Sequence, residues 1–312
     1  AIIFCKKAIE LNSNYAEAYN NLGIALKDYK KLEESEINFK KAIKLNPKYA
    51  EAYNNLGILY KDKNELENSK INYQKAIELK SDYAEAYYNL GITFRELGEL
   101  EKSETSYKLA IKYNPSYAEA YNNLGVTLRE LCKLDDSEKA YKKAIELKNN
   151  YPDPYNNLSF TLLLKNQFEE AYKFSEWRWQ TKYNIGKKFI TNKPLWNGEN
   201  NKTILVWKEQ GIGDEIMYNS ILPELNAISK KLIVHCDKRL IPLFRRSFSN
   251  DIIFESNKEN ISNNDFDYHI PIGSMPRFFR KDLKSFLNSS KGYLKSDNNK
   301  SLKFRDKLKN NE

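Results

Sequence analysis

Residues 15–23 read Tyr-Ala-Glu-Ala-Tyr-Asn-Asn-Leu-Gly, and nearly the same stretch returns at 49–57, 83–91 and 117–125. A weaker copy occupies residues 151–159, and the copies follow one another at a constant interval, which gives a 34-residue period. A fixed period of this length is typical of arrays in which each unit packs against its neighbours. We therefore expect a solenoid over residues 1–185.

The side-chain spacing within each repeat predicts two helices. With Ala16 counted as position 1, an advance of about 100° per residue places positions 4, 7, 8 and 11 on one packing face. Positions 20, 24 and 27 form the matching stripe of a second helix. Small residues at positions 8 and 27 allow the two helices to approach closely. In the first full repeat these positions hold Tyr19, Leu22, Gly23 and Leu26, followed by Ser35, Phe39 and Ala42.

This pattern resembles the tetratricopeptide (TPR) repeat, which implies an α-solenoid of helical hairpins. Four full repeats cover residues 16–49, 50–83, 84–117 and 118–151, and a degenerate one covers 152–185. Residues 1–15 match the second helix of an earlier repeat, so we expect the chain to begin inside a repeat. The divergence of the last repeat is what a terminal repeat packed against another element would show.

Positions 2, 5, 6, 9, 12 and 13 of each first helix lie opposite the packing face, and we call this surface the groove face. In a stacked solenoid it lines the concave side, where a protein or peptide would bind. Asparagine occupies position 6 in every repeat and a base occupies position 12 in four. Carboxamides can pair with a peptide backbone, and the bases favour acidic groups. The predicted groove residues are Asn21, Asn55, Asn89, Asn123, Asn157, Lys27, Lys61, Arg95 and Arg129.

A plainer interpretation of the asparagines remains open. Asparagine is abundant in this chain, it also fills position 5 in four repeats, and it is tolerated on a solvated surface. TPR proteins that bind peptides, including the O-linked N-acetylglucosamine transferase family, resemble this chain at position 6. That resemblance implies peptide binding by the groove face as a whole, since one hydrogen bond contributes only about 1 kcal/mol.

Composition narrows the class of protein. No apolar run approaches the ~18 residues that a membrane helix needs, and three widely spaced cysteines favour a reducing, cytoplasmic setting. With two histidines in the chain, no metal site or cofactor is expected. Residues 1–185 carry 28 basic and 27 acidic side chains, against 23 and 15 in residues 186–312, so the net charge changes from +1 to +8. The shift supports a boundary near residue 186, followed by a junction over 186–200.

Short apolar runs after the junction predict an α/β domain over residues 201–295. Thr203–Trp207, 232–236, 252–254 and 267–272 read as strands, with a helix over 214–228 and another over 241–248. Strands that alternate with helices at this spacing predict a doubly wound, Rossmann-like sheet. The lysine-rich residues 296–312 are expected to be a helical or frayed tail.

Two glycines after the first predicted strand suggest a dinucleotide site, which we disfavour. Met217 stands where the third glycine of that fingerprint belongs. Asp214 and Glu215 would also repel a phosphate at the start of the helix. A carboxylate beside the carboxyl end of a strand can instead accept a proton from an attacking hydroxyl, so Asp214 is a candidate general base. The alternative is that Asp214 is an ordinary N-terminal helix cap.

Three motifs resemble bacterial TPR proteins fused to a heptosyltransferase-like glycosyltransferase: Glu-Trp-Arg-Trp at 176–179, Pro-Leu-Trp-Asn-Gly at 194–198, and residues 207–214. The stretch 269–276 fits as well. The resemblance implies the acceptor-side half of a GT-B fold, a nucleotide-sugar donor for the complete protein, and a sugar or protein hydroxyl as acceptor. The resemblance also implies that Asp214 is the general base. The implied acceptor loop consists of Glu209, Gln210, Gly211, Gly213 and His269.

The same resemblance implies a second, donor-binding domain, for which the chain to Glu312 leaves no room. We therefore expect the 312 residues alone to lack transferase activity. The alternative is a non-enzymatic TPR adaptor that mediates protein–protein interactions. Nucleic acid is disfavoured as a partner, because the basic C-terminal part shows no interleaved aromatic residues and no known module.

Overall fold

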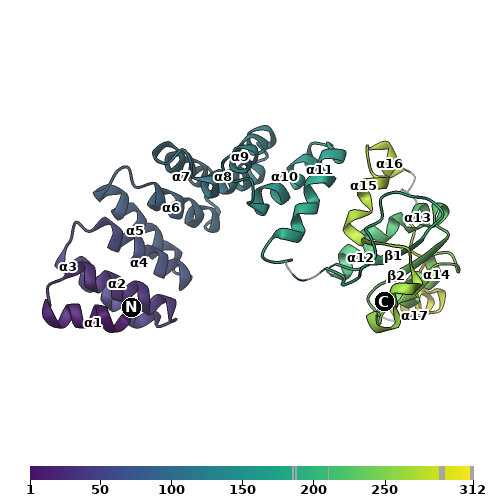
Figure 1. The fold of residues 1–312 in the computed structure, drawn as a ribbon, viewed down its shortest axis with the longest axis horizontal. Helices are drawn as coiled ribbons and strands as arrows, with labels where there is room; N and C mark the ends of the chain where they lie inside the picture. The colour runs from purple at the N-terminus through teal and green to yellow at the C-terminus, as the bar shows by residue number, and fades with distance from the viewer. Residues whose placement is uncertain (185, 187, 210, 288–291, 310–312) are drawn as a thin grey trace. The chain divides into compact units, whose positions relative to one another are not determined.

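The computed structural model describes residues 1–184, 186, 188–209, 211–287 and 292–309 (Figure 1). The chain divides into two compact units, Ala1–Leu158 and Ser159–Glu312. We call them the repeat unit and the α/β unit, and each is described by itself. The domain boundary predicted at residue 185 from composition and register stays a prediction.

The repeat unit consists of paired helices that recur with the period of the sequence repeat. The first helix of each pair begins at position 1 of its repeat, and a short turn separates it from the second. In each turn position 15 adopts a left-handed conformation, with φ between 58° and 78° in the four full repeats. The helices are α1 Ile2–Leu11, α2 Ala16–Asp28, α3 Leu32–Leu45, α4 Ala50–Asp62, α5 Leu66–Leu79, α6 Ala84–Glu96, α7 Leu100–Tyr113, α8 Ala118–Glu130 and α9 Leu134–Leu147. Helix α10, Pro152–Leu164, begins in this unit.

An aromatic ring over a glycine holds each hairpin together. A Cβ atom placed on Gly57 would lie 2.6 Å from Cε1 of Tyr73, and the other full repeats give 2.6 or 2.7 Å. These rings are fully buried, so they cannot swing away. In the four full repeats a side chain at position 8 would overlap this ring, which agrees with the close helix approach predicted from small residues there. The pairs are Gly23 with Phe39, Gly57 with Tyr73, Gly91 with Tyr107 and Gly125 with Tyr141.

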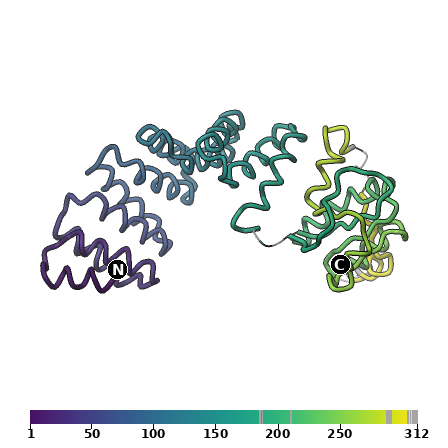
Figure 2. Tube along the Cα trace, viewed as in Figure 1, coloured from purple at the N-terminus to yellow at the C-terminus, as the bar shows by residue number. Residues whose placement is uncertain are grey.

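A buried serine at position 20 adds a hydrogen bond to the same interface. In three of the four full repeats its hydroxyl donates to the carbonyl oxygen of the position-8 glycine, for example Ser35 to Gly23 at 2.7 Å. In the second full repeat Ser69 lies instead 3.4 Å from the Thr93 hydroxyl. Between repeats, the first helices approach one another more closely than the second helices do. Because the first helices of successive repeats lie closer together than the second helices do, the stack curves with the groove face on its inner side. Figure 2 shows the succession of hairpins along the chain.

A four-stranded parallel sheet forms the centre of the α/β unit. Its strands are β1 Thr203–Trp207, β2 Lys231–His235, β3 Ile253–Glu255 and β4 Tyr268–Pro271. Their order across the sheet is β3-β2-β1-β4, so the chain extends the sheet in one direction and then returns to the other side of β1. All four predicted strands are present, with ends within a few residues of the expected positions.

The helices of this unit are short. They are α11 Phe168–Ser175, α12 Ile212–Tyr218, α13 Leu222–Ile228, α14 Ile241–Ser247, α15 Pro276–Phe279, α16 Lys284–Leu287 and α17 Asn298–Lys309, with 3-10 turns η1 Glu176–Gln180, η2 Asn219–Ile221, η3 Lys258–Asn260, η4 Asn263–Asp265 and η5 Ile272–Ser274. The continuous helix predicted over 214–228 is wrong. It breaks at η2 because Pro223 has no N–H and must stand in the first turn of a new helix, α13.

The larger core of the α/β unit lies on one face of the sheet, and a smaller buried cluster of Leu205, Ile233 and Phe266 lies on the other. In the larger core Ile204, Val206 and Val234 pack against Leu222 and Phe244 from the helices. Trp196, from the segment before β1, joins this core, with its ring centroid 4.5 Å from that of Phe278. The backbone N–H of Trp196 also donates to the carbonyl of His269, which fixes the segment beside β4.

Candidate functional site

The position-6 asparagines form hydrogen bonds between successive repeats. The amide nitrogen of Asn55 donates to Oδ1 of Asn20 at 3.0 Å, and that of Asn89 donates to Oδ1 of Asn54 at 3.1 Å. Asn123 donates to the Tyr88 hydroxyl at 3.1 Å, because tyrosine replaces asparagine at position 5 of that repeat. Asn157 donates to Asn122 at 3.0 Å. Each bond joins position 6 of one repeat to position 5 of the repeat before it. We call this series the asparagine ladder.

The ladder changes what these side chains can offer a ligand. The sequence suggested that both the donor and the acceptor of each carboxamide would be free, but the amide nitrogens are used inside the solenoid. Asn55 is half-buried, Asn89 is buried, and Asn21 is exposed at the first full repeat. Each position-6 nitrogen in the ladder donates one of its two N–H groups, so a second N–H and the carboxamide oxygen remain for a ligand. The exception is Asn123, whose Oδ1 also accepts from the Asn122 amide at 3.2 Å.

The bases at position 12 are also engaged by the next repeat. Lys27 lies 3.7 Å from Asp62, and Arg95 lies 3.5 Å from Glu130, so each base meets the acid at position 13 of the following repeat. Arg129 donates to the carbonyl oxygen of Asn157 at 3.4 Å. Lys61 makes no such ion pair with the part of the chain that the structure describes. Two of the four bases are therefore paired with acids of the following repeat.

A strip of aliphatic side chains at position 9 runs beside the ladder. Ile24, Ile58, Ile92 and Val126 are each half-buried, and the first three touch the hydrophobic clusters that join neighbouring repeats. Sequence reasoning placed position 9 on the groove face but assigned it no role. The sequence signal that could have revealed this strip is the aliphatic residue found at position 9 in all four full repeats. The strip adds apolar surface to a face that otherwise offers amide oxygens and paired charges.

In the α/β unit the strand order reverses between β1 and β4. In parallel sheets the carboxyl ends of two such strands open a crevice where ligands bind. Asp214 is the third residue of α12, which follows β1, and it is half-exposed. Gly211 rather than Asp214 stands at the N-cap, so the alternative of an ordinary cap does not describe Asp214. Burial, with Asp214 and Glu209 nearby, raises the pKa of the Tyr218 hydroxyl.

An arginine whose side chain is only 12% exposed joins several segments of this unit. Arg178, from η1, donates from Nε and Nη2 to the two carboxylate oxygens of Glu209, at 2.8 and 2.9 Å. The same guanidinium reaches the Ser274 hydroxyl at 2.8 Å and Glu176 at 3.1 Å. It lies over the Trp179 ring, 4.6 Å from its centroid. The three motifs around residues 176, 209 and 272 thus meet at one guanidinium, a contact that we did not predict.

Glu209 is fully engaged at this point. Besides Arg178, it accepts a hydrogen bond from the backbone N–H of Gly273 at 2.7 Å. A Cβ atom on Gly273 would lie 2.9 Å from the Glu209 carboxylate, so this approach requires glycine. The predicted role of Glu209 in acceptor binding would require this network to open or the acceptor to bind beside it.

The remaining predicted acceptor residues lie around the same edge. His269, in β4, is buried, and its Nδ1 accepts a hydrogen bond from Trp207 Nε1 at 3.0 Å. Burial lowers the pKa of His269, which favours the neutral ring. Gly211 and Gly213 are exposed, with nothing within 4 Å of a Cβ atom built on either. Gln210 lies outside the described residues.

Two further ionisable residues at this edge were missed. Glu215 is buried, and its carboxylate accepts from the backbone N–H of Asp237 at 2.8 Å; burial raises its pKa. His235, at the end of β2, is buried as well, and burial with Lys208 nearby lowers its pKa. A carboxylate on a helix and a histidine ending a strand give no sequence pattern that predicts this arrangement.

No group of three or more His, Cys, Asp or Glu residues in the described part of the chain could hold a metal ion, and no helix there is long and apolar enough to cross a membrane. Two cavities of about 560 and 290 Å³ open in the α/β unit, one beside Thr203 and Lys231, the other beside Arg245 and Phe254. Asp214 lines neither.

Comparison with protein families identifies the repeats. A family model described as TPR repeat matches residues 27–64, 59–98 and 91–131. Models described as tetratricopeptide repeat match residues 118–151, and residues 4–37 and 140–173. Together they span residues 4–173, more than half of the 312 residues, and the chain belongs to the tetratricopeptide-repeat family over that span.

Solved structures agree on the fold of this region. One match is to "Crystal structure of YrrB: a TPR protein with an unusual peptide-binding site", with 23% identity and a TM-score of 0.50 over 59% of this chain and 95% of that one. Another is to pilF of Pseudomonas aeruginosa, with 20% identity and a TM-score of 0.51 over 55% of this chain and 78% of that one. A comparison with curated proteins finds no match.

Proposed function

We propose that the repeats bind an extended protein or peptide segment along the groove face. The observation that carries this proposal is the asparagine ladder, which fixes a row of amide groups at every junction between the full repeats. Their oxygens can accept hydrogen bonds from peptide N–H groups regardless of sequence. The similar fold of YrrB, whose title names a peptide-binding site, supports this assignment.

The groove face also favours one chemistry of ligand. The aliphatic strip at position 9 gives apolar contact, while position 12 offers bases that are only partly neutralised by acids 3.5–3.7 Å away. Solvent-exposed ion pairs of this kind are weak and exchange readily. A ligand with aliphatic side chains and a few acidic groups would fit this combination.

Peptide binding can be tested with paired substitutions. Peptides selected from a phage library against the wild type would be measured by fluorescence anisotropy. An Asn55→Ala plus Asn89→Ala variant should lose most of the affinity, at least tenfold. The control, Asn38→Ala plus Asn72→Ala, removes asparagines at position 23 of the second helices, where each bonds only the backbone of its own helix. Equal affinities for the two double variants would contradict the proposal, with circular dichroism verifying that both remain folded.

For the α/β unit we propose a glycosyltransferase-like acceptor domain. The strand order β3-β2-β1-β4 is that of the first four strands of a doubly wound, Rossmann-like sheet, as one half of a GT-B fold would have. Asp214 lies at the point where this order reverses, and its half-exposed carboxylate could take the proton of an attacking hydroxyl. In this proposal the complete protein transfers a sugar from a nucleotide-sugar donor to a hydroxyl on a captured partner.

The adaptor alternative has one observation in its favour. Arg178 and Gly273 donate three hydrogen bonds to Glu209, so this predicted acceptor-binding residue is already engaged by protein groups. Titration of isotope-labelled protein with glucose, galactose and N-acetylglucosamine can separate the two functions. Acceptor binding should shift the amide resonances of Gly211, Gly213 and Gly273, and Asp214→Asn should weaken the effect. If the sugars leave the three glycine resonances unchanged while the repeats still bind peptide, the adaptor function is supported and the acceptor domain is contradicted.

A further inference from the structure

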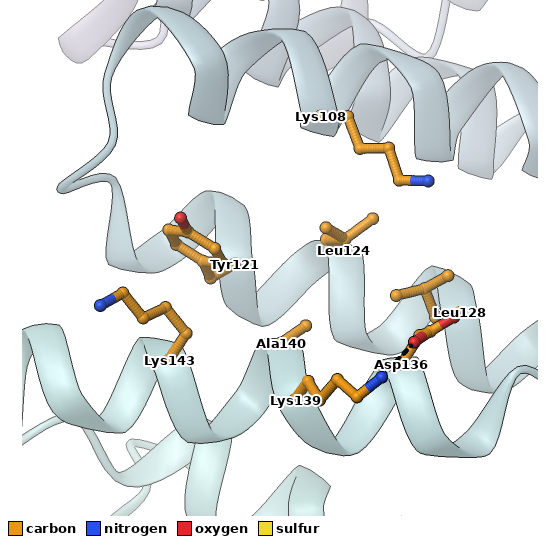
Figure 3. Close-up of a pocket in the computed structure, with 8 residues that line it drawn as sticks. All are labelled: Lys108, Tyr121, Leu124, Leu128, Asp136, Lys139, Ala140 and Lys143. Atoms are coloured by element: carbon orange, nitrogen blue, oxygen red, sulfur yellow. Dashed lines mark hydrogen bonds and ion pairs between the residues drawn. The ribbon is translucent and has the colours of Figure 1, made fainter.

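A hollow of about 470 Å³ opens on the side of the repeat unit away from the groove face (Figure 3). It lies among α7, α8 and α9, so it belongs to the third and fourth full repeats. Tyr121, Leu124 and Leu128 of α8 and Ala140 of α9 provide its apolar wall. A volume in this range is typical of sites that take a ligand side chain or a small molecule, about 300–1,000 Å³.

The sequence explains why the hollow forms at this repeat. Position 11 is Tyr60 in the second full repeat and Phe94 in the third, but the smaller leucine in the first, Leu26, and the fourth, Leu128, so only the fourth combines it with alanine at position 23. Position 23 is Asn38, Asn72 and Ser106 in the earlier repeats. In the fourth repeat it is Ala140, which has no side-chain atoms beyond Cβ. Two small residues at facing positions leave space that bulkier side chains occupy elsewhere.

Lysines surround the apolar wall. Lys108 projects from α7, while Lys139 and Lys143 project from α9, and one acid, Asp136, lies among them. Each lysine already contacts a carboxylate on its own helix: Lys108 with Glu104 at 2.6 Å, Lys139 with Asp136 at 3.0 Å and Lys143 with Glu146 at 2.8 Å. The two pairs on α9 are exposed on both sides and therefore weak, so a better-placed anion can replace the acid.

We infer that this hollow binds an acidic segment of a partner protein through one large apolar side chain. The apolar side chain would enter between Leu124, Leu128 and Ala140, while flanking carboxylates would pair with the lysines of the rim, above all Lys139 and Lys143. The combination of an apolar floor with a basic rim selects for this ligand, because either feature alone would accept many others. The site is separate from the groove face, so both can be occupied at once.

The test uses a fluorescein-labelled peptide, Glu-Asp-Glu-Phe-Glu-Asp, and the whole chain. Binding should be measurable by anisotropy at low salt and should weaken as salt is added. Lys143→Glu should reduce the affinity at least tenfold. Lys75→Glu is the matched control, since Lys75 occupies the same position 26 in the second full repeat and pairs in the same way with a glutamate three residues later. It should change the affinity less than twofold.

Three results would overturn the inference. Equal losses from Lys143→Glu and Lys75→Glu would show a general charge effect. Unchanged affinity for a peptide with serine in place of phenylalanine would show that the apolar wall takes no part. Loss of binding in the Asn55→Ala plus Asn89→Ala variant would place the peptide on the groove face. Retained binding in that variant, together with a tenfold loss in Lys143→Glu, supports the hollow.

Discussion

The repeat unit and the α/β unit are stabilised over different distances along the chain. In the repeat unit the principal contacts join residues 12 or 35 apart, as in the Ser35–Gly23 and Asn55–Asn20 hydrogen bonds, and they recur in later repeats. In the α/β unit Arg178 bonds Glu209, 31 residues away, and Ser274, 96 residues away. A change in the first should therefore act on neighbouring repeats, whereas a change in the second should act on the whole unit.

The tryptophans allow the two units to be followed separately. All four in the sequence, Trp177, Trp179, Trp196 and Trp207, belong to the α/β unit. Tryptophan fluorescence therefore reports unfolding of the α/β unit, while circular dichroism is dominated by the helices of the repeat unit. The following predictions use this difference.

The largest effect is expected from Arg178→Ala. It leaves Glu209 buried without its cation, which typically costs about 3–5 kcal/mol. The urea midpoint from tryptophan fluorescence should fall strongly, while the midpoint from circular dichroism changes little. Arg239 forms the same two-point contact with Asp237, at 2.9 and 3.0 Å, but its side chain is 68% exposed. Arg239→Ala should leave the urea midpoint nearly unchanged, because an exposed ion pair contributes little to stability. Equal shifts would show that burial of the Arg178 pair is unimportant.

A smaller loss is expected from Gly57→Ala. The new methyl group would overlap the fully buried ring of Tyr73, and overpacking of this kind costs about 1–3 kcal/mol. The dichroism midpoint should fall and the fluorescence midpoint should not. Gly213→Ala serves as the control, because nothing lies within 4 Å of the added methyl. A neutral or stabilising Gly57→Ala would mean that the hairpin can widen.

Acid should weaken the repeat unit through Glu36. Hydrogen bonds from Lys40 and Lys63 lower the pKa of this carboxyl from 4.5 to about 2. A lowered pKa adds stability above the ordinary pKa, and that stability is lost as the pH falls from about 4.5 toward 2. Glu36→Gln should cost about 1–2 kcal/mol at pH 7, allowing for solvent screening, and almost nothing at pH 2. Glu34→Gln, at an exposed pair, is the control. If the stability difference between the wild type and Glu36→Gln does not change with pH, the lowered pKa of Glu36 is not its cause.

The smallest effect has the opposite sign. The hydroxyl of Tyr107 is buried with no hydrogen-bond partner among the described residues, and burial raises its pKa. The first full repeat has Phe39 at this position, so the site accepts a ring without a hydroxyl. Tyr107→Phe should stabilise the repeat unit by about 1 kcal/mol. Tyr60→Phe should destabilise it instead, because that hydroxyl donates to Glu36 at 3.0 Å. If Tyr107→Phe and Tyr60→Phe lower the dichroism midpoint by the same amount, the two hydroxyls do not differ in their contribution to stability.

Local and periodic patterns predicted much of this architecture. The 34-residue repeat predicted the helical hairpins, and helical spacing predicted a close approach of the two helices at the position-8 glycine. The aromatic ring that packs on this glycine was seen only in the structure. Alternation of apolar runs with helical patterns predicted the four parallel strands. The continuous helix over 214–228 was wrong because its apolar spacing was given more weight than Pro223. The glycosyltransferase-like assignment and the role of Asp214 stay proposals.

The sequence by itself determined the repeats, because their contacts lie at fixed, short separations and each side chain meets an equivalent partner in every repeat. The tertiary structure alone decided how the polar groups are used. It directed the asparagine nitrogens to the preceding repeat and brought Arg178, Glu209 and Ser274 to one point. Such distant partners leave no periodic trace in a single sequence, since their meeting depends on how the strands are ordered in the sheet.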